Sequence, residues 1–181
     1  MITLLFLSAF ALNSTFAQKK EKTVEVGGAA MYPSKNIIQN AVNSADHTTL
    51  VAAVKAAGLV ETLQGAGPFT VFAPTNEAFN KLPKGTVETL VKPENKATLT
   101  KILTYHVIAG SFDAKAIAQL IKEGNGTATL KTVSGGTLKA SMKGNKLILT
   151  DEKGGMSTVT IKNVYQSNGV IHVIDTVVLP S

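Results

Sequence analysis

Apolar residues in the first half of the chain recur at the three- and four-residue spacing of an amphipathic α-helix. The clearest case is the segment 50–57, where positions 50, 51, 54 and 57 are apolar and share one helical face. Asp46 precedes this segment and Gly58 follows it, which predicts a capped start and a left-handed C-terminal end. The same spacing predicts helices at 37–42 and 59–63, after Thr86, at 93–105, and at 113–123 with Ser111 or Asp113 as cap.

After Gly126 the period of the apolar positions changes to two, which is the alternation expected of β-strands. Gly144-Asn145 separates two alternating segments and suits a two-residue hairpin turn. The segment 158–164 should have one solvent-exposed face, whereas 170–179 is nearly continuous in Val and Ile and should be buried on both faces. Further strands are predicted at 127–132, 137–143 and 146–150. Helices followed by antiparallel strands predict an α+β fold and disfavour a parallel α/β sheet.

The segment 69–79 places a strand, a corner and a helix start next to one another. A short apolar strand around Val71 should end at Pro74, since proline cannot continue the ladder of hydrogen bonds. Thr75 is then placed to cap a short helix that carries Phe79.

Residues 1–17 have the pattern of a signal peptide, with an apolar run from Ile2 to Leu12 and small residues at Thr15 and Ala17 before a cleavage site. The run is shorter than the roughly 20 apolar residues that span a bilayer, so we expect no transmembrane segment. A buried N-terminal helix is the competing interpretation. We expect export, to the periplasm or out of the cell, and a flexible tail over residues 18–33.

Length and composition fit one domain, over residues 34–181, because 181 residues with 44% hydrophobic content supply one core. The chain has no cysteine, which excludes disulfides, thiolate zinc sites and an acylated-Cys membrane anchor. All 18 basic residues are Lys, against 12 acidic residues, and without Arg we expect no nucleic-acid partner. Lysines can bind anionic polymers through their charge, although scattered lysines also simply keep a protein soluble.

No catalytic or metal-binding pattern is present in the sequence. The three His residues show no HExxH spacing, and Ser111 and Ser134 lack the GxSxG turn of a hydrolase. His47 follows Asp46 at a helix start, where an exposed side chain is expected, and His172 lies among Val and Ile as a core residue. We therefore expect no catalytic residue, no cofactor and no metal.

Three segments together resemble the fasciclin (FAS1) domain family. They are TVFAPTNEAF at 70–79, Tyr105-His106, and NGVIHVIDTVVLP at 168–180, in the order and spacing of that family. The resemblance covers residues 34–181 and is to the small secreted bacterial type with a single domain. It implies a β-wedge of two mainly antiparallel sheets with a helical N-terminal half, an adhesion or matrix-associated role, and no general catalytic activity.

The resemblance also implies that His106 bonds to the first motif near Thr75, and it leaves Tyr105 and His106 as candidates for contact with a partner. We expect most of the motif residues to maintain the fold, with short polar side chains satisfying free backbone N–H groups and Asp175 bonded to backbone or hydroxyl groups. The residues with an expected structural role are Phe72, Pro74, Thr75, Asn76, Phe79, Tyr105, His106, Asn168, Gly169, His172 and Asp175.

The sequence thus predicts a secreted or periplasmic, non-enzymatic and monomeric adhesion protein whose partner is a cell-envelope or matrix protein or polysaccharide. Two alternatives stay open: a small-molecule carrier with a pocket between sheets and helices, and a hydrolase with a site around His106 and His172. Tyr32 and Tyr165 are the aromatic residues left for stacking on a carbohydrate, because most of the Phe residues are expected in the core.

Overall fold

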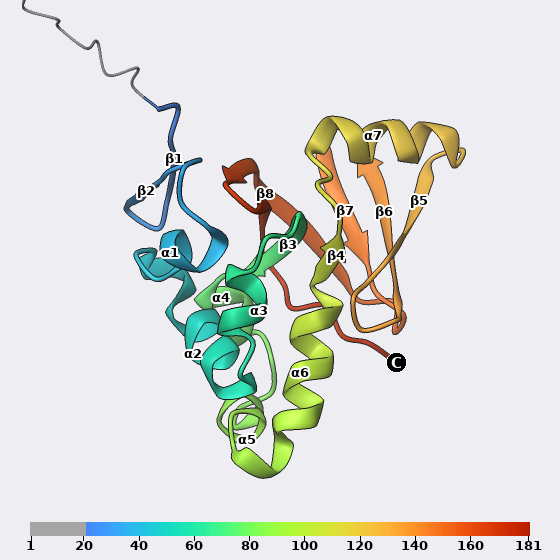
Figure 1. Ribbon diagram of the computed structural model, residues 1–181. Coiled ribbons are helices and arrows are strands. Elements are labelled where there is room, and N and C mark those ends of the chain that lie inside the picture. Colours follow the sequence, from blue (N-terminus) through green and yellow to red (C-terminus); the bar gives the residue numbers. More distant parts are fainter. Residues whose placement is uncertain (1–20) are drawn as a thin grey trace, which may run out of the picture.

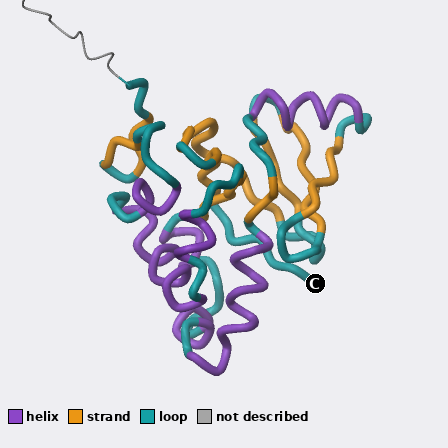
Figure 2. Tube along the Cα trace, in the orientation of Figure 1, coloured by secondary structure: helices purple, strands orange, loops and turns teal. Residues whose placement is uncertain are grey.

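The computed structural model describes residues 21–181, so the signal peptide predicted over 1–17 lies outside the described residues. Its helices are α1 Ile37–Ala41, α2 Thr48–Ala57, α3 Val60–Gln64, α4 Asn76–Asn80, α5 Thr86–Leu90, α6 Lys96–Tyr105 and α7 Ala114–Glu123, with 3₁₀ segments at Ala45–His47 and Pro93–Asn95. Helices α1 to α6 gather on one side of a bent sheet, and α7 lies across strands of the second half (Figure 1, Figure 2).

In residues 21–181, seven strands form one sheet and two form a separate hairpin. The strands are β1 Val24–Val26, β2 Ala29–Met31, β3 Phe69–Pro74, β4 Val107–Ala109, β5 Thr127–Lys131, β6 Thr137–Lys143, β7 Lys146–Thr150, β8 Met156–Gln166 and β9 Gly169–Ile174. The order in the large sheet is β4-β3-β9-β8-β7-β6-β5. Every neighbouring pair is antiparallel except β3 and β9, which run parallel.

The long strand β8 divides the sheet into two halves. Its residues 156–158 pair with β7 and its residues 159–166 pair with β9, with register shifts in the second part. Such shifts bend a strand and increase its twist. The far edges of the two halves meet again through a bridge between Ile108 and Thr132. The expected α+β fold with a helical N-terminal half is therefore confirmed. The two mainly antiparallel sheets expected of the wedge are the two halves of one seven-stranded sheet.

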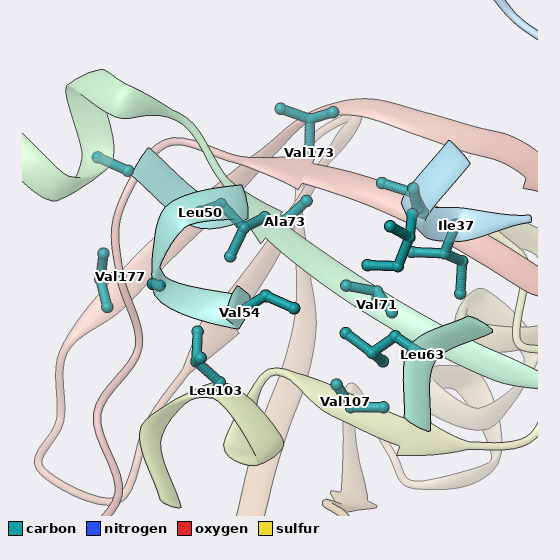
Figure 3. Packing of buried hydrophobic residues seen from close by; sticks show 14 of the residues in the cluster. Ile37, Leu50, Val54, Leu63, Val71, Ala73, Leu103, Val107, Val173 and Val177 are labelled. Carbon is teal, nitrogen blue, oxygen red and sulfur yellow. The ribbon is translucent and has the colours of Figure 1, made fainter. Parts of the chain in front are cut away.

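Two hydrophobic clusters lie on opposite faces of β3. Val71 and Ala73 point to the helices, where they pack with Leu50 and Val54 of α2 (Figure 3). Phe72, which lies between them in the chain, belongs to the second cluster, inside the wedge and beneath α7. Because β3 is covered on both faces, its sequence is apolar at successive positions instead of alternating.

Asn168 connects two helix ends to the central sheet at the start of β9. Its side-chain nitrogen donates to the carbonyl oxygens of Leu63 and Gly65 at 2.8 Å each, at the end of α3. Its Oδ1 accepts from the N–H of Ile37, the first residue of α1, at 3.0 Å. Its backbone carbonyl accepts from the N–H of Phe69 at 3.0 Å, where the parallel pairing begins. One buried amide thus holds three parts of the chain together.

Several local predictions are confirmed. Gly58 ends α2 in the left-handed conformation, with a φ of 72°. Asp113 caps α7 by accepting from a backbone N–H at 2.8 Å. Gly144 and Asn145 connect β6 and β7, with Lys143 opposite Lys146 in the register. Each of these signals acts within a few residues, which is why the sequence alone shows it.

The flexible tail predicted over residues 18–33 is wrong for residues 24–31, which form the β1–β2 hairpin. The Gly27-Gly28 pair is its turn, with φ of 58° and 73°. Val26 and Met31 are only 1% and 2% exposed, and β2 packs against α1 and β8. Burial of these apolar side chains offsets the entropy lost on ordering the segment.

The closing strand is shorter than the predicted 170–179, because β9 ends at Ile174. Beyond it, the N–H of Val178 donates to His106 Nε2 at 3.2 Å, and the N–H of Leu179 donates to Asp151 Oδ2 at 2.9 Å. Side chains therefore take the place of a neighbouring strand, and the segment is buried without belonging to the sheet.

Replacing Asn168 by Ala should lower the free energy of unfolding by about 2–4 kcal/mol, because several backbone groups lose their partner. Denaturant titration followed by circular dichroism measures this loss. Asn80→Ala is the matched control, since Asn80 is exposed at the end of α4, and it should change stability by no more than about 0.5 kcal/mol. Equal stability of the two variants would contradict the anchoring role of Asn168.

Candidate functional site

The first motif forms the junction between β3 and α4. Thr75 Oγ1 accepts a backbone N–H of α4 at 3.2 Å and caps that helix. Asn76 serves a different helix: its Oδ1 accepts from the N–H of Thr49 at 3.0 Å, and its Nδ2 donates to the carbonyl of Ala45 at 2.9 Å. Helix α2 has no side-chain cap from its own N-terminal residue, so the cap predicted at Asp46 is wrong. A residue distant in sequence satisfies that helix end.

His106 ties the end of α6 to the C-terminal segment. Its Nδ1 donates to the carbonyl of Ile102 at 2.8 Å and its Nε2 accepts from the N–H of Val178 at 3.2 Å, which fixes the tautomer. Both ring nitrogens are used, so the contact expected between His106 and the first motif near Thr75 does not come from the ring. The backbone makes the connection instead, since the N–H of Phe72 donates to the His106 carbonyl at 2.9 Å. Burial lowers the pKa of His106 to about 4.

Tyr105 connects the helical half to the second half of the sheet. Its hydroxyl donates to the carbonyl of Thr137 at 2.5 Å and accepts from the N–H of Glu152 at 3.2 Å. Burial raises the pKa of Tyr105 to about 12, although the hydrogen bond from Glu152 opposes this. Tyr105 and His106 are 0% and 2% exposed, so neither lies on a surface that a partner could contact.

His172 faces Phe72 across the parallel strands, and the two rings stack with centroids 5.6 Å apart. Its Nε2 donates to the carbonyl of Phe112 at 2.9 Å, and its Nδ1 accepts from the N–H of Asn163 at 3.4 Å. Burial lowers the pKa of this imidazole as well. The ring is therefore a neutral hydrogen-bonding group of the core.

The remaining motif residues also act within the fold. A Cβ at Gly169 would collide with the backbone of β3, so the parallel pairing requires glycine there. Asp175 accepts from the N–H of Thr158 at 2.8 Å and from two neighbouring hydroxyl groups. Pro74 is the last residue of β3, and Phe79 of α4 is buried in the helical cluster.

His47 is buried, with 2% exposure, and the expectation of an exposed side chain is wrong. Its Nδ1 bonds to the hydroxyl of Ser44 at 2.9 Å. Burial lowers its pKa more than the nearby Ala73 carbonyl and the Asp46 charge raise it. The β1–β2 hairpin packs next to this segment, with Gly27 accepting from the N–H of Ala45 at 3.1 Å. The burial of His47 therefore depends on the β1–β2 hairpin, whose local signal in the sequence is the Gly27-Gly28 pair.

The buried polar groups do not form a catalytic site. Within residues 21–181, no group of three or more His, Asp or Glu could hold a metal ion. Every ring nitrogen of His106 and His172 is hydrogen-bonded inside the fold, and both pKa values are lowered. Neither ring is free to exchange a proton with a substrate, so a hydrolase built around them lacks its base.

Two apolar cavities border His106. One of about 60 Å³ lies among α1, α2, α3 and β3, and a larger one of about 320 Å³ lies among α4, α5, α6 and residues 177–179. Only the second approaches the volume of ordinary small-molecule sites, about 300–1,000 Å³.

The two tyrosines considered for carbohydrate stacking are partly exposed. Tyr32 is 38% exposed, with the Lys35 ammonium 4.8 Å from its ring centre. Tyr165 is 45% exposed, and its hydroxyl donates to Asp113 at 3.1 Å. Each side chain thus has a polar partner from the protein itself.

Known proteins have sequences similar to that of this chain. The family described as the fasciclin domain matches residues 45–180. The chain belongs to the fasciclin domain family. Protein sll1483 of Synechocystis sp. is 44% identical over 179 residues, which cover 96% of this chain and 92% of that protein. Immunogenic protein MPB70 of Mycobacterium bovis is 37% identical over 145 residues, covering 77% of this chain and 66% of that protein. Both relatives are bacterial.

A solved FAS1 domain pair from the insect cell adhesion molecule Fasciclin I has the same fold. It matches 82% of this chain and 52% of its own chain, with a TM-score of 0.73 and 17% identity. At that identity the likeness establishes the fasciclin fold alone. Among residues 21–181, none of the helices has the length and apolar character needed to cross a membrane.

The lowered pKa of His106 predicts how stability depends on pH. Its ordinary pKa near 6.5 applies to the unfolded chain, and the folded value is about 4. Between these values the unfolded chain binds a proton that the folded chain does not. The stabilising contribution is therefore complete above about pH 6.5 and is lost as the pH falls towards 4, by about 2 kcal/mol between pH 7 and pH 5.

His106→Gln tests this dependence, because the amide does not titrate. Its free energy of unfolding should fall less than that of the wild type between pH 7 and pH 5, as measured by denaturant titration at each pH. His47 and His172 titrate in both proteins and cancel in the comparison. Parallel stability curves for the two proteins would refute the assignment.

Proposed function

We propose that this protein is a non-enzymatic adhesion module that acts outside the cytoplasm and binds a component of the cell envelope or matrix. Membership of the fasciclin family supports the proposal, and the solved structure with the same fold comes from a cell adhesion molecule. The signal-peptide pattern of residues 1–17 is the reason for placing it in the periplasm or outside the cell.

One observation carries the proposal: the polar residues of the family motifs are used inside the fold. Asn168, His106 and His172 are each buried, and each bonds to backbone groups of distant segments. Such groups hold a rigid framework together and leave no pair of side chains for acid–base chemistry. Presentation of a rigid surface is the function that this arrangement serves best.

A carrier of a small apolar molecule is the second candidate, favoured by the cavity of about 320 Å³ beside α5 and α6. Phe79, Leu90 and Leu99 contribute to its apolar lining. Native mass spectrometry of the purified protein distinguishes this candidate, because a carrier retains a bound molecule and an adhesion module shows the mass of the chain alone.

Co-sedimentation with isolated envelope fragments of the producing organism tests the adhesion function. At low salt the folded protein should bind in a saturable manner, and binding should weaken at high salt because exposed charges are screened. Heat-unfolded protein is the control for nonspecific adherence. The proposal fails if the folded protein does not sediment with any envelope fraction, or if it turns over an envelope polymer.

A further inference from the structure

The first part of β8 and the strands β5, β6 and β7 present one continuous outward surface. Residues paired directly across neighbouring strands lie on the same face, and the register aligns Thr129, Lys139 and Thr150 in one row. Leu138, Ala140 and Leu149, which alternate with the residues of this surface, are fully buried. We name this surface the Lys face. It comprises every second residue of β5, β6 and β7 from the first residue of each strand, and Met156 and Thr158 of β8. Thr160 and Lys162 of β8 are included because they line the same groove as Lys146 and Thr158.

The Lys face carries positive charge without a compensating carboxylate. Five of its fourteen positions are lysines and none is Asp or Glu, and the remainder are six Thr, one Ser, one Ile and one Met. Within residues 21–181 the lysines that donate side-chain hydrogen bonds are Lys81 and Lys101, which lie elsewhere. The lysines of the face are Lys131, Lys139, Lys143, Lys146 and Lys162, all exposed.

Two carboxylates that contact residues of the face are already bonded within the protein. Glu152 accepts from the N–H of Thr137 at 2.8 Å and from the N–H of Ser181 at 2.9 Å. Asp175 accepts from the N–H of Thr158 at 2.8 Å. Both therefore stabilise local backbone and leave the ammonium groups of the face available to an external anion.

Lys143 and Lys146 are directly opposite each other beside the β6–β7 turn. Like charges in this position destabilise a strand pair. An anionic group placed between them would relieve the repulsion, so the pair costs stability in the free protein and favours an anion.

A groove of about 430 Å³ adjoins this pair where β7 and β8 diverge. Lys146 and Lys162 both line it, together with Thr158, Thr160 and Asp175. The Asp175 carboxylate already accepts hydrogen bonds from the protein itself, and the two ammonium groups outnumber it. Pairing between the strands covers only residues 148–150 of β7, so Lys146 and Leu147 lie beyond the ladder and leave the groove open. Its size is that of a small-molecule site, which suits one sugar unit of a polymer.

We propose that the Lys face binds an acidic polysaccharide, with a carboxylate-bearing sugar in the groove between Lys146 and Lys162. This rests on the proposed adhesion function and names the class of its partner. Ammonium groups attract the carboxylates, and the hydroxyl groups of the Thr and Ser positions exchange hydrogen bonds with the sugar hydroxyls.

The composition of the face favours this polymer over other polyanions. Single-stranded nucleic acid is bound by stacking on aromatic residues, and the face has none. Peripheral membrane binding uses an apolar surface that enters the lipid, whereas Ile148 and Met156 are the face's apolar residues among fourteen positions. A face of hydroxyls and lysines matches a polymer of hydroxyls and carboxylates.

Binding to immobilised alginate, a polyuronate, tests the proposal, with dextran as the neutral control. The Lys-face variant replaces Lys139, Lys143, Lys146 and Lys162 by Gln. The matched control replaces Lys55, Lys84, Lys92 and Lys122 by Gln, which removes an equal number of positive charges from exposed positions outside the Lys face. The Lys-face variant should bind alginate at least about tenfold more weakly, or 1.4 kcal/mol, and the control should stay within about threefold of the wild type.

A second variant distinguishes a loss of binding from a loss of folding. Lys143→Gln with Lys146→Gln removes the opposed like charges, so it should raise the melting temperature while weakening the binding of alginate. Equal losses for the Lys-face variant and its control would overturn the proposal, because net charge alone would then explain binding. The proposal would also be overturned if the protein bound anionic phospholipid vesicles or envelope fragments but not alginate. That result would leave the adhesion function standing.

Discussion

The parallel pairing of β3 with β9 is the contact on which the rest of the structure depends. It joins residues 69–74 to residues 169–174, about one hundred positions apart in the chain. Bringing such distant segments together has a large entropic cost, which local contacts cannot offset. The helices α1 to α6 then pack on one face of this pair and the wedge closes on the other, so both hydrophobic clusters include residues of the two strands.

Buried polar groups make this pairing specific. Apolar strands can slide past one another, whereas a buried amide or imidazole left without its partner costs free energy and so selects one arrangement. Asn168 fixes the start of β9 against two helix ends, His172 fixes its middle against the Phe112 carbonyl, and His106 holds the segment that follows. The motif residues that carry the family resemblance are thus those that fix the register.

The features that could be predicted from the sequence are those that a few neighbouring residues determine. The Thr75 cap, the Gly58 helix end and the Gly144-Asn145 turn each depend on a few adjacent positions, and the motifs indicated the fasciclin wedge. Contacts between residues far apart in the chain could not be predicted from the sequence. Asn76 caps a helix that begins 28 positions earlier, and His106 bonds to a residue 72 positions later.

The same distinction between local patterns and distant contacts applies to the surface. Alternation along β6 and β7 already indicates which lysines face water, but only the register between strands shows that they form one face without acidic residues. The groove likewise depends on where β7 and β8 stop pairing, which no local pattern records. A binding surface made by strand register can therefore escape a search for motifs.

The central claim is that the family motifs hold the fold while the Lys face makes the contact with a partner. Two-dimensional NMR of ¹⁵N-labelled protein, titrated with a uronate oligosaccharide, tests it most directly. We expect saturable shifts at the backbone amides of Lys139, Lys143, Lys146 and Lys162, with those of Thr75, His106 and Asn168 unchanged. Shifts confined to the motif residues, with the amides of the Lys face unmoved, would contradict it.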